Sequence, residues 1–218
     1  MVTNHGMKAL VLGATGAVGR DLVDHLLHDE AFDAVEIFVR RHVPLSSPKL
    51  KTHVVDFDRV EEWHHLLQGD VLFSCLGTTL KAAGSKDAQW KVDYTYQYEA
   101  ARAARSNGVE CMALVSSIGA DSGSRVFYTR MKGRLDEDVQ NLGYPRLFIL
   151  RPPSLIRKES DRFGEKAGVA TLKVLNAAGL LGSLRPMETD ILAAAMISLS
   201  KGNLSGTHVI NSQDIKRI

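Results

Sequence analysis

An apolar run that leads directly into three spaced glycines sets the architecture of this chain; it reads Ala9-Leu10-Val11-Leu12-Gly13-Ala14-Thr15-Gly16-Ala17-Val18-Gly19-Arg20. The four apolar residues predict a buried strand, and the small residues after them predict a tight turn. The next apolar positions recur on one face of a helix: Leu22, Val23, Leu26 and Leu27. Strand, glycine turn and helix in succession are typical of the first unit of a doubly wound parallel sheet.

The glycine turn is suited to holding a phosphate. Gly13 can take the turn without a Cβ clash, Gly16 lets backbone amides approach a ligand, and Gly19 lets the helix pack close to the strand. The helix start adds unpaired N–H groups and a positive dipole end. We therefore predict that the turn binds a dinucleotide, through Gly13, Thr15, Gly16, Ala17, Val18 and Gly19. The alternative is a plain tight turn, since any such turn favours glycine.

Composition limits the class of protein. The 218 residues suffice for one α/β domain with a full core, and 27 basic against 25 acidic residues leave a charge of +2. That balance favours neither nucleic acid nor a membrane surface as a partner. Cys75 and Cys111 lie in apolar runs and are expected to be reduced core residues, so we predict no disulfide and no metal site. Without a visible secretory signal or membrane span, the expected location is cytoplasmic.

A second predicted strand, 34–39, ends at Arg40 and Arg41. In dinucleotide-binding units the end of this strand lies beside the adenosine ribose, where an acidic residue binds the 2′-hydroxyl and an arginine accommodates a 2′-phosphate. Two arginines without a carboxylate therefore predict NADP(H) rather than NAD(H) as the cofactor. The alternative is a solvated basic turn without a ligand.

Two more predicted strands end at the same edge of the sheet. The strand at 52–55 ends at Asp56 and Phe57, and an aspartate there is also an ordinary N-cap for a helix at 60–67. The strand within 70–75 leads into a small-residue turn, which under this fold lies over the cofactor. We expect this turn to contact the ribose and phosphates, through Cys75, Leu76, Gly77 and Thr78.

Residues suited to proton transfer follow the fifth predicted strand, 109–115, which runs into Ser116 and Ser117. Tyr128 and Lys132 come next, at a spacing that puts both on one face of a helix. A tyrosine with the reference pKa of about 10 is a poor base at neutral pH, and a neighbouring ammonium favours the phenolate. We therefore predict Tyr128 as the acid/base and Lys132 as its tuner. Alone, such a pair is more often structural, so its weight comes from the motifs before it.

The order of these motifs resembles the atypical short-chain dehydrogenase/reductases, and is most similar to the Tat-interacting-protein-like subgroup of NADPH-binding oxidoreductases. The segments Gly13–Gly19, Cys75–Thr79 and Ser116–Asp121 carry the resemblance, together with Tyr128 and Lys132. The resemblance implies an α/β fold: a Rossmann-like doubly wound parallel sheet of about six to seven strands with a small C-terminal substrate lobe.

The resemblance also assigns roles to single residues. It implies that Asp56 and Phe57 lie against the adenine ring and that Lys132 holds the nicotinamide ribose. Arg151, in an Arg-Pro turn after a predicted strand at 146–150, is implied to border the nicotinamide. A structural ion pair is an equally open role for Arg151.

The two serines and one aspartate need separate treatment. The resemblance favours Ser117 as the ligand of the substrate oxygen, because an apolar residue and a glycine follow it, whereas Ser116 is expected to satisfy local backbone groups. Relatives carry an asparagine on the helix predicted at 84–107, where it positions the catalytic lysine. Asp93 stands there instead, which leaves the proton relay open.

We predict one domain over residues 1–218, with a cofactor-binding core at 7–153. A small substrate lobe or lid at 154–206, with helices at 164–181 and 187–199, is expected before a last strand at 207–210. Nothing in the lobe specifies a ligand.

The predicted function is NADP(H)-dependent hydride transfer to or from a small carbonyl or alcohol substrate, by a monomer or homodimer. The first alternative is an NADP(H)-binding sensor or regulatory protein with little turnover. A sugar-nucleotide epimerase or dehydratase also fits the glycine pattern, but it calls for a larger substrate domain than this chain has room for.

Overall fold

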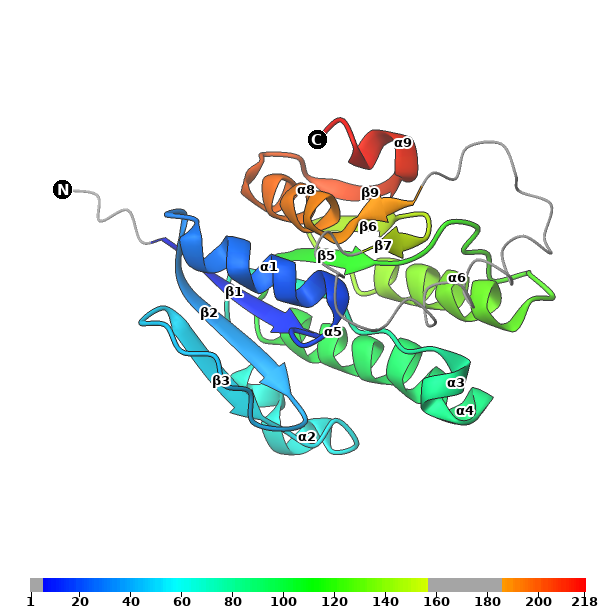
Figure 1. Cartoon of the computed structure of the whole chain (residues 1–218), viewed down its shortest axis with the longest axis horizontal. Coiled ribbons are helices and arrows are strands. Elements are labelled where there is room, and N and C mark those ends of the chain that lie inside the picture. Colours follow the sequence, from blue (N-terminus) through cyan, green and yellow to red (C-terminus); the bar gives the residue numbers. More distant parts are fainter. Residues whose placement is uncertain (1–5, 157–185) are drawn as a thin grey trace.

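The computed structural model describes residues 6–156 and 186–218, which form a parallel sheet covered by helices on both faces (Figure 1). Its seven strands lie in the order β3-β2-β1-β4-β5-β6-β9, and every neighbouring pair is parallel. The strands are β1 Met7–Leu12, β2 Phe32–Val39, β3 Leu50–Val54, β4 Val71–Ser74, β5 Cys111–Val115, β6 Arg146–Arg151 and β9 Gly206–Asn211. The predicted doubly wound sheet of six to seven strands is therefore confirmed.

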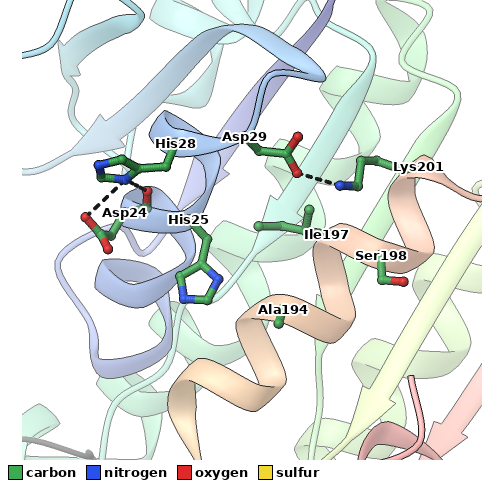
Figure 2. A pocket seen from close by; sticks show the side chains of 8 residues that line it. All are labelled: Asp24, His25, His28, Asp29, Ala194, Ile197, Ser198 and Lys201. Carbon is green, nitrogen blue, oxygen red and sulfur yellow. Dashed lines mark hydrogen bonds and ion pairs between the residues drawn. The ribbon is translucent and has the colours of Figure 1, made fainter.

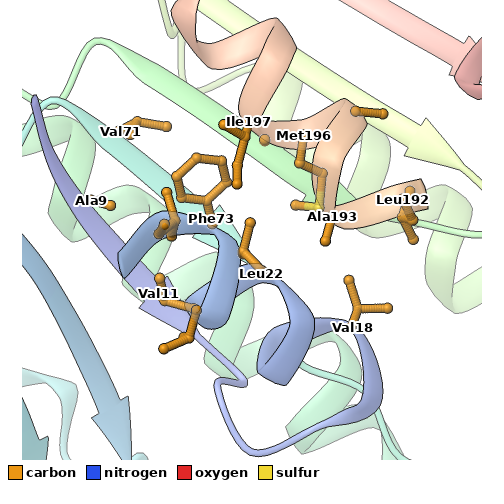
Figure 3. Packing of buried hydrophobic residues seen from close by; sticks show 14 of the residues in the cluster. Ala9, Val11, Val18, Leu22, Val71, Phe73, Leu192, Ala193, Met196 and Ile197 are labelled. Atoms are coloured by element: carbon orange, nitrogen blue, oxygen red, sulfur yellow. The ribbon is translucent and has the colours of Figure 1, made fainter. Parts of the chain in front are cut away.

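One face of the sheet is covered by α1 (Ala17–His28) and α8 (Thr189–Lys201), with α9 (Ser212–Ile215) after the last strand. Because both faces of the sheet are covered, the central strands β1, β4 and β5 are largely apolar, and their alternate side chains enter different cores. Val11 and Phe73 pack with Leu22 of α1 and Met196 of α8 (Figure 3).

The other face is covered by α2 (Val60–Trp63), α5 (Tyr96–Ser106) and α6 (Phe127–Gln140). Leu10 and Leu12, the neighbours of Val11 in β1, enter this second core. Small residues of α5 at this face, including Ala100 and Ala101, let the helix lie close to the sheet.

The helix predicted at 84–107 is in fact three elements. Residues Lys86–Trp90 (α4) and Tyr96–Ser106 (α5) flank a π-helical turn, η2, at Lys91–Thr95. A short helix, α3 (Leu80–Ala83), precedes them and ends at Gly84, whose φ of +85° is left-handed. A π turn changes which side chains face the protein, and such turns are frequent at functional sites.

Two of the remaining predicted helices differ from the structure in their bounds. The helix predicted at 60–67 is α2 followed by a 3₁₀ turn, η1, at His64–Leu66. The helix predicted at 187–199 begins at Thr189, because Met187–Glu188 (β8) pairs with Leu155–Ile156 (β7). The helix predicted at 164–181, and with it most of the lobe, lies outside the described residues. None of the described helices has the length and apolar character needed to cross a membrane.

Candidate cofactor and catalytic site

The strand order reverses at β1 and β4, so the carboxyl ends of these two strands frame the crevice where ligands bind in such sheets. Leu12 pairs with Ser74, which brings Gly13 next to Cys75. Gly13 has a left-handed φ of +81°, and a Cβ there would lie 2.6 Å from the Cys75 carbonyl carbon. A Cβ on Gly19 would overlap the Gly13 carbonyl oxygen. Both glycines are thus required by the close approach of backbone to backbone.

The start of α1 leaves backbone donors for a ligand. Gly16 is the N-cap residue of α1, and it makes no side-chain capping hydrogen bond. The N–H of Arg20 donates to the Gly16 carbonyl (3.1 Å) and forms the first hydrogen bond of the helix. The N–H groups from Ala17 to Gly19 therefore have no backbone partner within residues 6–156 and 186–218. Thr15, Gly16 and Ala17 are exposed, whereas the Val18 side chain is in the core and offers only its backbone. These features fit a dinucleotide pyrophosphate.

The second turn, after β4, lies beside the first. The Cys75 N–H donates to the Leu12 carbonyl (2.9 Å), and burial raises the pKa of the Cys75 thiol to about 12. Gly77 is exposed, and the nearest protein atom to a Cβ there would be an oxygen of Asp93 at 3.6 Å. The turn therefore has room for a ligand above it.

At the end of β2, Arg40 and Arg41 are both exposed. Asp56 uses Oδ1 to accept the N–H of Asp58 (2.9 Å) in a local turn, and it makes no cap bond to α2. Phe57 is only 4% exposed, which leaves little of its ring for adenine; it belongs to the core instead.

The sequence did not reveal a polar cluster beside Arg40. The Tyr96 hydroxyl donates to Asp58 (2.7 Å), which also pairs with Lys91 (2.7 Å). Burial and the Asp58 carboxylate raise the pKa of Tyr96 to about 12, while Arg40 lies close enough to oppose this. Arg40 thus lies near the Tyr96 phenol, which is itself hydrogen-bonded to the Asp58 carboxylate.

The proposed chemical residues lie at the carboxyl end of β5. Ser117 follows this strand, and its buried hydroxyl oxygen has no hydrogen-bond partner among the described residues. Lys132 of α6 is 3% exposed, and its ammonium donates to the Val115 carbonyl of β5 (3.4 Å). Tyr128 lies half-buried one turn earlier on α6 and makes no hydrogen bond to a described residue. Its hydroxyl is therefore available to a ligand.

Asp93, on the π-helical turn, is 1% exposed and lies 3.8 Å from the Lys132 ammonium. Its Oδ2 accepts the N–H of Thr78 (2.9 Å), so it ties the second turn to the lysine. Burial raises the pKa of Asp93, and Lys132 and the Thr78 N–H only partly oppose this. The aspartate that departs from the expected asparagine is thus the buried ionic partner of Lys132.

Arg151 takes the ionic role that the sequence left open. Its Nε donates to Oδ2 of Asp136 (3.0 Å), and its Nη2 lies 2.9 Å from the same oxygen in an ion pair. Asp136 is fully buried on α6, and its Oδ1 has no hydrogen-bond partner among the described residues. Burial raises the pKa of Asp136, with Ser116 and Arg151 opposing.

Ser116 is not used as expected. Its buried hydroxyl oxygen has no hydrogen-bond partner among the described residues, although it lies close enough to Asp136 to act on the pKa of that carboxyl. Only the position of Asp136 one turn after Lys132 could have indicated this cluster from the sequence.

A pocket of about 500 Å³ lies elsewhere, between the carboxyl ends of α1 and α8 (Figure 2). An ion pair between Asp29 and Lys201 (2.6 Å) crosses it, and His28 hydrogen-bonds the Asp24 carbonyl (2.8 Å). Within the described residues, no group of three or more His, Cys, Asp and Glu is arranged to hold a metal ion.

Comparison with known proteins agrees with this architecture. A family described as NAD(P)H-binding matches residues 13–174. Protein FMP52-1, mitochondrial, of Scheffersomyces stipitis is 39% identical over 80% of this chain and 79% of its own length. Protein FMP52, mitochondrial, of Eremothecium gossypii is 36% identical over 96% of both chains.

Solved structures share the fold at low sequence identity. MoeE5 in complex with UDP-glucose and NAD has a TM-score of 0.71 at 16% identity, covering 94% of this chain and 75% of that one. A UDP-glucose 4-epimerase with UDP-glucose from Thermotoga maritima has a TM-score of 0.71 at 15% identity, over 94% and 76%.

The predicted cytoplasmic location is wrong, because these relatives are named as mitochondrial proteins. The prediction rested on the lack of a secretory signal and of a membrane span. Mitochondrial targeting segments are amphipathic and rich in arginine and serine, so the lack of an apolar segment has no bearing on import into mitochondria.

Proposed function

The chain belongs to the NAD(P)H-binding family of Rossmann-fold proteins, and from this we propose that it is an NADP(H)-dependent short-chain dehydrogenase/reductase. Its substrate is a small carbonyl or alcohol. One observation carries the proposal: the buried Ser117 hydroxyl oxygen lacks a partner among the described residues, two positions after the β5 carbonyl that Lys132 bonds. An orphaned buried hydroxyl is costly unless a ligand or water pairs with it.

Each of these residues has a separate role in the proposed reaction. The glycine turn and the free N–H groups of α1 bind the pyrophosphate, and NADP(H), when bound, supplies or accepts the hydride. The Ser117 hydroxyl hydrogen-bonds the substrate oxygen. Tyr128 gives a proton to that oxygen as a carbonyl is reduced, or takes it as an alcohol is oxidised. Lys132 stands one turn after Tyr128 on the same face of α6 and holds the nicotinamide ribose.

The preference for NADP(H) rests on Arg40 and Arg41, which are exposed at the end of β2. A charge-assisted bond to a 2′-phosphate contributes about 1.5–3 kcal/mol. Replacing both arginines with alanine is expected to weaken NADPH binding by at least about tenfold and to leave NADH binding unchanged. Arg217→Ala, at an exposed arginine of the last turn, is the control. Tighter binding of NADH than NADPH by the wild type would refute the preference.

The acid/base assignment is tested by NADPH oxidation against a panel of aldehydes and ketones. Tyr128→Phe is expected to abolish turnover and keep NADPH binding. Tyr98→Phe is a matched control, because Tyr98 is half-buried on α5 and stacks on Tyr94 (5.9 Å between ring centroids). Turnover that survives Tyr128→Phe would refute the role of the phenol.

A redox-sensing or regulatory protein is the second candidate, and the Lys132–Asp93 pair favours it. The carboxylate offsets the charge with which the ammonium would activate a phenol. If the wild type and Tyr128→Phe both bind NADPH and neither oxidises it with any carbonyl compound of the panel, this candidate replaces the first.

Within the family, we further place the chain among the atypical short-chain dehydrogenase/reductases, near the Tat-interacting-protein-like subgroup. The segments Gly13–Gly19 and Ser116–Asp121 support this placement. We propose a monomer or homodimer that acts on small molecules, without a nucleic-acid or membrane partner. Its place in mitochondria follows from the names of its relatives.

A further inference from the structure

The Lys132 ammonium sits in a fixed ionic environment. Lys132 and Asp93 have side chains 4% and 2% exposed, so solvent screens this pair weakly. Asp93 cannot swing away, since its Oδ2 holds the Thr78 N–H and its carbonyl accepts the Gln97 amide (2.7 Å). Gln97 is in turn held by the Ser74 hydroxyl (2.8 Å). The carboxylate is therefore kept beside the ammonium.

The other charges around Lys132 balance one another. Asp136, one turn later on α6, is paired with Arg151 of β6. The Cys75 thiol near Lys132 is neutral, because burial raises its pKa to about 12. Asp93 therefore decides the net charge of the described groups around Lys132. With the Asp93 carboxylate this net charge is zero, and without it one positive charge remains.

This charge acts differently on the two forms of a nicotinamide cofactor. The oxidised ring carries a positive charge and the reduced ring carries none, so an uncompensated lysine repels only the oxidised form. We propose that Asp93 sets the redox preference of the site, by cancelling the charge of Lys132 so that the oxidised cofactor is bound without repulsion. This inference rests on the proposed binding of NADP(H).

The test compares the dissociation constants of NADP⁺ and NADPH by calorimetry at pH 8.5, an alkaline pH chosen because burial raises the pKa of Asp93. Asp93→Asn preserves an oxygen for the Thr78 N–H and removes the charge. We expect it to raise the ratio of the NADP⁺ to the NADPH dissociation constant roughly tenfold, the scale on which one unit charge acts on another in a partly buried site.

Two further variants separate charge from structure. Lys132→Met leaves Asp93 unbalanced, so the ratio is expected to fall below the wild-type value; this arm also decides the matter if Asp93→Asn does not fold. Asp138→Asn is the control. It removes a carboxylate of α6, the helix of Lys132, that pairs with Arg134 instead (2.8 Å), and it is expected to leave the ratio unchanged.

Equal changes in both dissociation constants, with an unaltered ratio in Asp93→Asn and Lys132→Met, would overturn the role of Asp93 and leave the proposed function standing. A wild type that binds neither NADP⁺ nor NADPH would instead overturn the proposed function itself.

Discussion

Gly19→Ala tests whether the glycine turn is built by close backbone packing. Alanine in a helix is favoured over glycine by about 1 kcal/mol, so helix propensity alone predicts a more stable protein. The new Cβ, however, would stand 2.7 Å from the Gly13 carbonyl carbon and 2.9 Å from the Ala14 Cα, where ordinary contact begins at 3.4 Å. These atoms are backbone and cannot rotate away, so α1 has to shift.

Overpacking of this kind costs about 1–3 kcal/mol, and the backbone partners put this site at the upper end. After the gain in helix propensity, we expect a net loss of about 1–2 kcal/mol in the free energy of unfolding, measured by urea titration. The displaced N–H groups of α1 should also weaken NADPH binding by at least about tenfold.

Gly143→Ala is the matched control for this experiment. Gly143 has a left-handed φ of +68° with no other atom within 4 Å of a Cβ, so alanine there costs only backbone strain, about 1–2 kcal/mol. It is expected to leave NADPH binding unchanged. A Gly19→Ala protein as stable as the wild type, or one that binds NADPH equally well, would refute the packing argument.

Three further predictions concern the core and its polar groups. Leu22→Ala empties a fully buried site between α1 and α8 and is expected to cost about 2–5 kcal/mol in urea unfolding; a cost below about 1 kcal/mol would contradict the packing described. Burial raises the pKa of Glu36, but the hydrogen bonds from Lys8 and His53 outweigh burial and lower that pKa below 4.5. The ionised Glu36 therefore stabilises the fold above about pH 4.5, and this stabilisation is lost on acidification. Glu36→Gln should therefore make the decline of Tm below pH 4.5 less steep. An unchanged decline of Tm in this variant would contradict the role of Glu36. Tyr144→Phe removes a buried hydrogen bond to a carbonyl of α5 (2.6 Å) and should lower the free energy of unfolding by about 1–3 kcal/mol, measured by thermal unfolding. An unchanged free energy of unfolding would contradict this hydrogen bond.

The fold could be predicted because its signals are local. The apolar run of β1 and the turn at Gly13 depend on neighbours within a few residues, and the same holds for the spacing of Tyr128 and Lys132 on α6. The π-helical turn at Lys91–Thr95 escaped prediction, since its residues have the helical pattern of α4 and α5 on either side. It carries Asp93, which lies 3.8 Å from the Lys132 ammonium of α6, a contact that no local pattern specifies.

The role of Phe57 could not be predicted from its residue type alone. An apolar residue at the end of β3 fits both an adenine contact and a core position. Only the packing around the ring assigns it to the core: Trp63 meets it edge-on and Tyr96 at a tilt, at 5.4 and 5.5 Å between centroids. These neighbours come from α2 and α5, whose positions no local pattern specifies.

The sequence by itself determined the parallel α/β architecture, the glycine turn and the order of the Ser117, Tyr128 and Lys132 motifs, because each depends on residues close together in the chain. The tertiary structure decided the ionic partners. Asp93 and Lys132 are 39 positions apart in the numbering, and they meet only because η2 and α6 pack side by side at the end of β5. Charge in a buried site depends on which elements converge there, and that is set by packing and register across the whole sheet.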